Sequence, residues 1–143
     1  MKQFRDFISE ARQMPEFEPI RPNISGVVID GLNMVIRGQI THWTVKNYAT
    51  HEALGDFYET LKEQLDHLVE SCIAVGYDTN DLEQVNINVQ GNDLQTFEID
   101  LMQYRDSISE TIAMMPTKFG SIEDILVSIQ KTIDTMSYKL TLS

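Results

Sequence analysis

Four stretches of the chain carry apolar residues at the three- and four-residue spacing of an amphipathic helix, and this pattern constrains the fold most strongly. They run from Gly26 to about Asn47, from Leu54 to Cys72, from Leu94 to Met115, and from Ser121 to Leu140. Gly76 follows the second stretch and Pro116 ends the third, and both residue types commonly terminate helices. We expect the hydroxyl of Ser121 to cap the fourth helix.

The lengths of the connections predict how these helices pack. Little chain separates the first helix from the second, or the third from the fourth, so each pair is expected to be antiparallel. The polar residues 77–91 between the pairs indicate a long crossover, within which the alternating segment Val85–Val89 favours an extended conformation. The prediction is an all-α, four-helix bundle with ferritin-like connectivity over residues 26–143.

The first 25 residues differ from this pattern. Pro15, Pro19 and Pro22 are three of the four prolines in the chain, and proline interrupts a helix interior. We therefore interpret residues 1–25 as an N-terminal arm outside the main core, with a short amphipathic helix before the first proline.

Charge and cysteine content limit the classes of partner. Asp and Glu number 22 against 11 Lys and Arg, and the net charge of -11 argues against direct, charge-driven binding to nucleic acid. The single cysteine, Cys72, excludes an internal disulfide and a thiolate metal cluster, so we expect a reducing compartment. No apolar run approaches the roughly 20 residues of a membrane span, so a soluble protein is expected.

Two pairs of residues could bind a metal. His42 and His51 flank the short turn between the first two helices, so both are expected near one end of the bundle. Asp66 and Glu70 lie four residues apart on the second helix, so both carboxylates project from one side. The alternatives are that His42 is a satisfied boundary residue and that the carboxylates belong to an ordinary solvated face.

The two pairs cannot meet within one chain. His51 and Asp66 are 15 positions apart on one helix, which corresponds to roughly 22 Å. A second copy related by a twofold axis would bring its Asp66 and Glu70 against His42 and His51, forming two equivalent sites. Mixed imidazole and carboxylate ligands suit iron or another first-row divalent metal. The sequence thus predicts a metal site between chains.

Other residues of the first helix indicate close packing. Gly31 and Gly38 share a side of the helix with His42, and we expect another backbone to approach there. Trp43 falls on the predicted apolar stripe and is assigned to packing, as is Cys72 on the second helix.

The pattern of His42-Trp43, His51-Glu52, Asp66 and Glu70 resembles the Dps family of mini-ferritins over the first two helices. This resemblance implies a ferroxidase that oxidises Fe(II), often with hydrogen peroxide, and stores the mineral in a shell of twelve subunits. His42 and His51 would be ligands from one subunit, and Asp66 and Glu70 ligands from its twofold mate. Two departures are a shorter interval between the histidines and Gly55 in place of a further Asp ligand.

The N-terminus carries a second resemblance. Residues Met1–Ala11 are similar to the capsid-targeting leaders of internal head proteins in large tailed phages. This implies cleavage between Glu10 and Ala11, and a location in the bacterial host cytoplasm or the phage head interior. The alternative function is a non-enzymatic phage structural or interaction protein, such as a packaged head component, that keeps the fold without metal chemistry. Gly55 favours that alternative.

Overall fold

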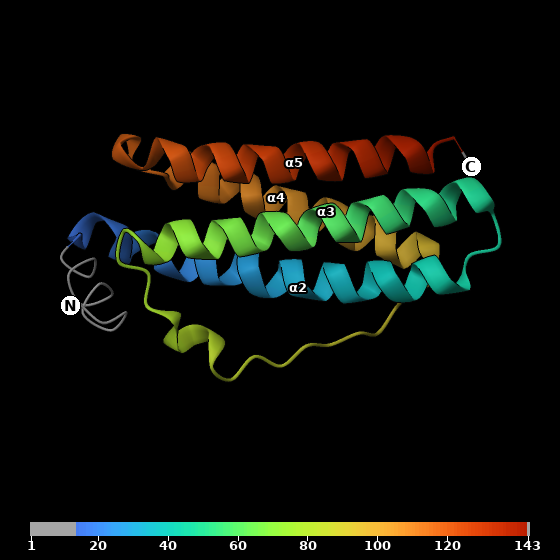
Figure 1. Cartoon of the computed structure of the whole chain (residues 1–143), viewed down its shortest axis with the longest axis horizontal. Coiled ribbons are helices and arrows are strands. Elements are labelled where there is room, and N and C mark those ends of the chain that lie inside the picture. Colours follow the sequence, from blue (N-terminus) through green and yellow to red (C-terminus); the bar gives the residue numbers. More distant parts are fainter. Residues whose placement is uncertain (1–13, 143) are drawn as a thin grey trace, which may run out of the picture.

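The computed structural model describes residues 14–142, which form four long helices lying side by side (Figure 1). The long helices are α2 (Arg21–Thr44), α3 (Tyr48–Ile73), α4 (Leu94–Met114) and α5 (Gly120–Leu140). Three short 3-10 helices accompany them: η1 (Pro15–Ile20), η2 (Thr79–Leu82) and η3 (Thr117–Phe119). The all-α prediction is confirmed, since the described part of the chain contains no strand.

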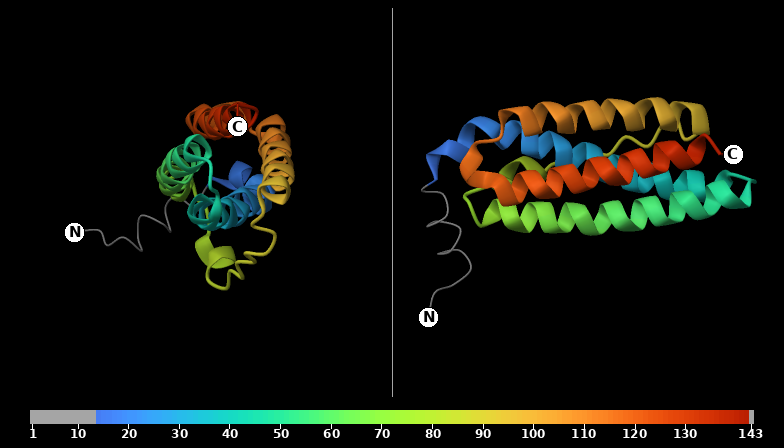
Figure 2. Two further views of the ribbon diagram at one scale, coloured as in Figure 1. Left: turned by 90° about the vertical axis from the view of Figure 1, so that its right-hand side faces the viewer. Right: turned by 90° about the horizontal axis from the view of Figure 1, so that it is seen from above.

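The helices pack as two antiparallel pairs. α2 contacts α3 and α4, and α5 contacts the same two helices from the opposite side, as the end-on view in Figure 2 shows. Residues 45–47 turn α2 back into α3, and residues 115–119 turn α4 back into α5. The crossover of residues 74–93 returns along the bundle beside α2, so α3 and α4 run in the same direction (Figure 1).

Side-chain caps begin two of the long helices. The Asn47 side chain accepts a hydrogen bond from the backbone N–H of Thr50 at the start of α3. The Asp93 carboxylate accepts one from the N–H of Thr96 at the start of α4, and this bond lowers the pKa of Asp93. The predicted cap by Ser121 is wrong. Because η3 leads directly into α5, that helix begins at Gly120 without a side-chain cap.

The first long helix begins earlier than predicted. It starts at Arg21 rather than Gly26, with Pro22 in its first turn. Proline is tolerated there because the first backbone N–H groups of a helix have no partner within the helix, so its missing N–H costs little. The prolines therefore mark helix starts in this region rather than a segment without helices.

Residues 15–25 belong to the bundle. Phe17, Ile20 and Ile24 are buried in the core, and Phe17 makes edge-on ring contacts with Tyr77 and Phe119. The predicted arm boundary at residue 25 is therefore wrong. Residues 1–13, which include the short amphipathic helix, the leader resemblance and the cleavage position after Glu10, lie outside the described residues.

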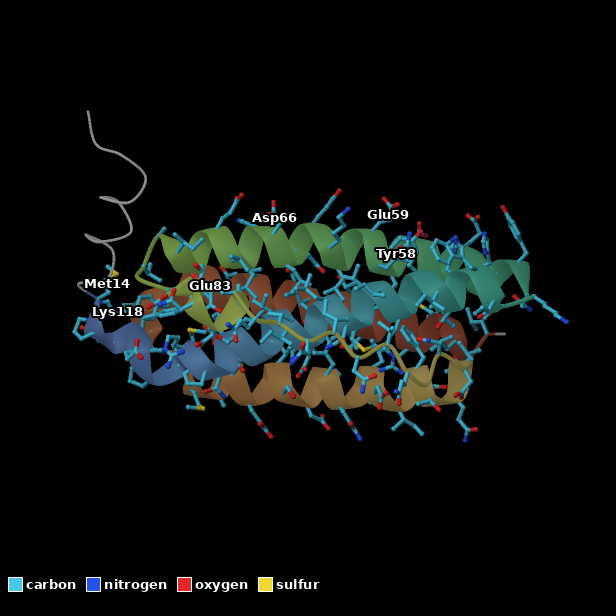
Figure 3. All side chains as sticks on the ribbon, turned by 90° about the horizontal axis from the view of Figure 1, so that it is seen from below. Met14, Tyr58, Glu59, Asp66, Glu83 and Lys118 are labelled. Atoms are coloured by element: carbon cyan, nitrogen blue, oxygen red, sulfur yellow. The ribbon has the colours of Figure 1, made fainter. Side chains whose placement is uncertain are left out.

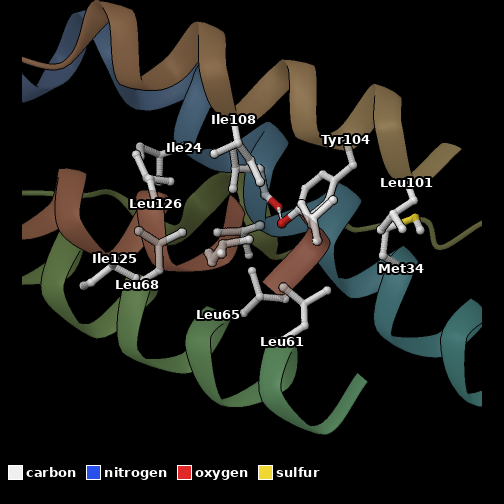
Figure 4. Close-up of a cluster of buried hydrophobic side chains, with 14 of the residues drawn as sticks. Ile24, Met34, Leu61, Leu65, Leu68, Leu101, Tyr104, Ile108, Ile125 and Leu126 are labelled. Atoms are coloured by element: carbon white, nitrogen blue, oxygen red, sulfur yellow. Dashed lines mark hydrogen bonds between the residues drawn. The ribbon is translucent and has the colours of Figure 1, made fainter. Parts of the chain in front are cut away.

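All four long helices contribute to one hydrophobic core, part of which is shown in Figure 4. The labelled side chains there are Ile24, Met34, Leu61, Leu65, Leu68, Leu101, Tyr104, Ile108, Ile125 and Leu126. Cys72 is also fully buried, as expected, and burial raises the pKa of its thiol to about 12. Within residues 14–142, no helix combines the length and apolar character needed to cross a bilayer.

The buried face of α2 is rotated from the predicted stripe. Arg37 and Thr41 are buried, because both bind the crossover, whereas Leu32 and Val35 are only half-buried. Trp43 is 66% exposed, so its assignment to packing is wrong. Polar groups occupy the inner face near this end of α2, and Leu32 and Val35 are left at its outer edge.

Side chains, not a backbone, pack against the two glycines of α2. A Cβ atom on Gly31 would lie 2.5 Å from Tyr104 Oη and 2.7 Å from Leu65 Cδ2. A Cβ atom on Gly38 would lie 3.4 Å from Phe57 Cδ1. The expected backbone approach is therefore wrong: Gly31 accommodates side chains of α3 and α4, and Gly38 accommodates side chains of α3.

Candidate functional site

The short turn between α2 and α3 places His42 and His51 at one end of the bundle, as the sequence predicted, and also brings their rings into direct contact. Their ring centroids are 3.6 Å apart and their planes differ by 16°. His42 Nδ1 lies 2.5 Å from the carbonyl oxygen of His51, and His51 Nδ1 lies 2.7 Å from the carbonyl oxygen of His42. A carbonyl only accepts, so both Nδ1 atoms carry hydrogen and donate. In the neutral tautomer with hydrogen on Nδ1, the lone pair is on Nε2, and this nitrogen can bind a metal.

Three neighbours position the histidine pair. The ring of Tyr58 meets His42 edge-on at 5.5 Å, and the ring of Tyr48 stacks on His51 at 6.2 Å. A Cβ atom on Gly55 would lie only 3.2 Å from His42 Cε1. The glycine that replaces the expected Asp therefore makes room for an imidazole ring.

The sequence pattern did not point to either tyrosine. Tyr48 lies one turn before His51 on the same helix, and this spacing was the available signal for its contact. The negative charge of Glu52, which also hydrogen-bonds the hydroxyl, raises the pKa of Tyr48. Tyr48 is thus a neutral aromatic neighbour of the pair at neutral pH.

The ring geometry limits how the pair can bind a metal. An imidazole lone pair lies in the plane of its ring, and the two planes are nearly parallel. Lone pairs that lie in two stacked, nearly parallel planes do not converge, so the two rings as they stand do not chelate one ion.

Asp66 and Glu70 lie farther along α3, where both side chains are exposed. Neither carboxylate has a hydrogen bond or ion pair with any described residue. His67, next to Asp66 on the same helix, is exposed as well. Across residues 14–142, no three His, Cys, Asp or Glu side chains gather as a metal site would require. The predicted ligands therefore form two separate pairs, as their spacing on α3 requires.

A groove between α2 and α3 connects the regions of the two pairs. Its volume is about 680 Å³, and Leu82 of the crossover borders it. Apolar side chains form its floor: Val28, Leu32, Val35, Leu65 and Val69. Glu59, Glu63 and Asp66 outnumber Lys62 among the charged residues that line it, so its rim is net acidic, and Figure 3 shows Glu59 and Asp66 projecting from the outer side of α3. Tyr58, which contacts His42, also lines the groove.

Comparison with known proteins identifies a family but no function. A protein-family model described as a family of unknown function (DUF5856) matches residues 42–140. This match covers more than half of the chain, which therefore belongs to that family. The matched region begins at His42 and includes His51, Asp66 and Glu70. No curated protein and no solved structure matches the chain.

Proposed function

We propose that this chain is a Dps-like mini-ferritin, with ferritin-like connectivity, that binds Fe(II) between two copies of itself. The observation that carries the proposal is the His42–His51 pair. Both Nδ1 atoms are held by backbone carbonyls of the same chain, and no described residue hydrogen-bonds to either Nε2 atom. Metal-binding histidines are typically oriented in this way, by a hydrogen bond from the ring nitrogen that does not bind the metal.

The carboxylates complete the proposed site only when a second copy is present. A twofold axis across the bundle places Asp66 and Glu70 of one copy opposite His42 and His51 of the other, twice per dimer. The acidic groove rim would repel the same rim of another copy. Bound cations neutralise this repulsion, so we expect Fe(II) to favour the dimer.

The proposed chemistry is oxidation of Fe(II), which is substrate and cargo rather than a resident cofactor. Neutral imidazole and carboxylate ligands with open positions suit Fe(II). Two Fe(II) ions supply the two electrons that reduce one hydrogen peroxide to two waters, with two protons taken up. Storage in a twelve-subunit shell is the further step that the Dps resemblance implies.

The test is an anaerobic Fe(II) titration of the purified chain, followed by oxygen or peroxide. We expect metal uptake and ferric absorbance from the native chain, and loss of both from the double variant Asp66→Asn/Glu70→Gln. The matched control is Glu59→Gln/Glu63→Gln, which removes two carboxylates from the same helix without touching the predicted ligands. No uptake by the native chain, or equal uptake by the two double variants, rejects the proposal.

A second candidate is a non-enzymatic protein, such as a packaged head component of a tailed phage. The observation that favours it is the contact of His42 with Gly55, where no carboxylate is available as a further ligand. In that case the role of the histidine pair is to stabilise the α2–α3 turn through its hydrogen bonds. A dimer that takes up no Fe(II), and whose function survives His42→Ala and Asp66→Ala, supports this candidate.

A further inference from the structure

The crossover is anchored to α2 near both of its ends. Near the first end, Ser25 Oγ lies 2.8 Å from Tyr77 Oη and donates to Asp81 Oδ2 at 2.7 Å, and Arg21 pairs with the same carboxylate. Near the second end, Arg37 donates to the carbonyl of Gly91 at 2.8 Å. These contacts hold the crossover along one side of the bundle.

The second anchor is reinforced by two further contacts. The Thr41 hydroxyl shares its hydrogen between the carbonyl of Arg37 in its own helix, at 2.7 Å, and the carbonyl of Asn92 in the crossover, at 3.1 Å. The guanidinium of Arg37 pairs with Asp100 at 2.7 Å, which ties the same point to α4. Both ends of the crossover are thus fixed by side chains of α2.

Between these anchors the chain is extended. Ser25 and Thr41 are roughly 24 Å apart along α2, and residues 81–92 cover this distance at about 2 Å per residue, between the rise of an α-helix and that of a strand, because the first residues of the stretch are still helical or turned. Glu83 still has helical dihedral angles, and Gly91 has φ of 74°, so both residues bound the extended part. Figure 1 shows it as a long strand-like trace beside α2.

Most of the backbone of this part is unpaired. Within the described part of the chain, residues 86–90 make no backbone–backbone hydrogen bond, and one side chain, Asn92, donates through Nδ2 to the carbonyl of Val89 at 2.7 Å. Ile87 at its centre is 37% exposed, and Asn86 and Asn88 are exposed on either side of it. A row of free N–H and C=O groups beside β-branched side chains is a template for pairing with another strand.

The sequence of this segment matches itself in the reverse direction. Residues 84–90 read Gln-Val-Asn-Ile-Asn-Val-Gln from either end. We propose that Gln84–Gln90 pairs with the same segment of a second copy as an antiparallel two-stranded ribbon, with the twofold axis at Ile87. Ile87 then faces Ile87, Asn86 faces Asn88, and Val85 faces Val89, so every cross-strand pair joins identical residue types. In an isologous contact residue i meets j and j meets i, and the palindrome makes both members of each such pair the same residue type.

The ribbon places the twofold axis where the proposed iron sites need it. Along the long axis of the bundle, Ile87 lies about midway between the anchors at Ser25 and Thr41. The contacts of Gly31 and Gly38 with α3 show that the residue of α3 at the same height is near Lys62. A twofold axis that joins the two ligand pairs must lie midway between them, which on α3 is near Leu61. This position is within about one helical turn of the height of Ile87. Antiparallel strands also make the two bundles antiparallel.

This inference rests on the proposed function for the choice of a second copy as partner, but its test uses no metal. Three single variants are compared under mild oxidation with a chelator present: Ile87→Cys, Gln84→Cys and Gln90→Cys. Ile87→Cys brings two thiols together at the axis, where paired Cα atoms lie about 4.5–5.5 Å apart, within the range for a disulfide. Native Cys72 is buried and does not compete.

We expect Ile87→Cys to form a covalent dimer roughly tenfold faster or more than either glutamine variant alone. In a dimer of Gln84→Cys alone, or of Gln90→Cys alone, the two identical thiols lie roughly 20 Å apart. In a mixture of the two variants, a dimer that contains one chain of each has the thiol at position 84 facing the thiol at position 90 across the ribbon. Cross-linking of that mixture, above either variant alone, establishes the register. Equal cross-linking of all variants, or none, overturns the ribbon.

The outcome separates the two proposals. Selective cross-linking by a chain that takes up no Fe(II) supports the ribbon and rejects the iron site. Fe(II) uptake that depends on Asp66 and Glu70, without selective cross-linking, rejects the ribbon and supports the iron site.

Discussion

A pair of candidate ligands lies at each end of α3, one shared between α2 and α3 and the other on α3 alone, and the two pairs are held in different ways. At the first end, His42 and His51 are half-buried, stacked and fixed by two hydrogen bonds to backbone carbonyls. At the other end, Asp66 and Glu70 are exposed and have no partner among residues 14–142. Contacts within the chain fix the orientation of the two histidine rings, whereas the two carboxylates have no contact that fixes their orientation.

This difference separates stability from function along one helix. Groups that are satisfied within the chain contribute to folding, so their loss lowers stability even without metal. Exposed carboxylates without partners contribute little to folding and are free to bind a cation. Each prediction below tests this contrast or the packing that supports it, starting with the largest expected effect.

The core between the two ligand pairs fixes their positions relative to each other, and α2 packs closely against this core at Gly31. We expect Gly31→Ala to lower the free energy of unfolding by about 2–3 kcal/mol, because its Cβ displaces Leu65 and the Tyr104 hydroxyl that donates to Val27. Gly26→Ala is the matched control. It meets nothing within 4 Å, and should stabilise by about 0.5–1 kcal/mol. Denaturant titration measures both, and equal effects would contradict the packing.

Removing each ligand pair in turn tests the contrast itself. In the presence of a chelator, His42→Ala/His51→Ala should lower the free energy of unfolding by about 1–2 kcal/mol, since two hydrogen bonds are lost. Asp66→Ala/Glu70→Ala should change it by less than about 0.5 kcal/mol. Urea unfolding followed by circular dichroism measures both variants. Similar losses from the two pairs would show that the ends are not held differently.

Alkaline pH tests whether the interior is closed beneath the exposed carboxylates. Burial raises the pKa of Cys72 from 9.0 to about 12. Below pH 9 the thiol is protonated in the folded and unfolded chains, so its contribution to stability is complete. Between pH 9 and 12 only the unfolded thiol ionises, and that contribution is lost as the pH rises.

The matched variant for this pH dependence is Cys72→Ala. We expect the native chain to lose about 1 kcal/mol more stability than the variant between about pH 8 and about pH 10. The measurement is urea unfolding at each pH. Parallel losses in the two chains would mean that the thiol is already accessible in the folded protein.

The smallest expected effect is at Trp43, beside His42. Because this side chain is 66% exposed, Trp43→Phe should change the free energy of unfolding by less than about 0.5 kcal/mol. Thermal unfolding checks the value. A large loss would place Trp43 in the core and would show that the histidine end is more deeply buried than described.

The sequence predicted the helices well because apolar periodicity reflects local structure. Each of the four helices was expected near its observed position, and the short turn predicted that His42 and His51 lie near the same end of the bundle. The pattern misplaced the buried face of α2, because Arg37 and Thr41 are buried by their bonds to the crossover, a tertiary contact that periodicity does not report. The start at Arg21 was missed because Pro22 was interpreted as a helix breaker instead of a first-turn residue.

The details of the candidate site depended on side-chain conformations that spacing does not specify. The sequence identified the residue pairs and their separation along α3. It did not show that the imidazoles bond to each other's backbone, or that Gly55 is the surface on which His42 rests. The assignment of a second copy as the source of carboxylate ligands remains a prediction, since one chain shows only half of each proposed site.

Half-site complementation tests the shared site most directly. Co-expression of His42→Ala/His51→Ala with Asp66→Asn/Glu70→Gln gives mixed dimers in which one site regains all four native side chains. Each variant alone should bind no Fe(II) at the site, whereas the mixture should recover about a quarter of the native sites, because half of the dimers are mixed and each has one intact site. A mixture that binds no more Fe(II) than its parents contradicts a site built from two chains.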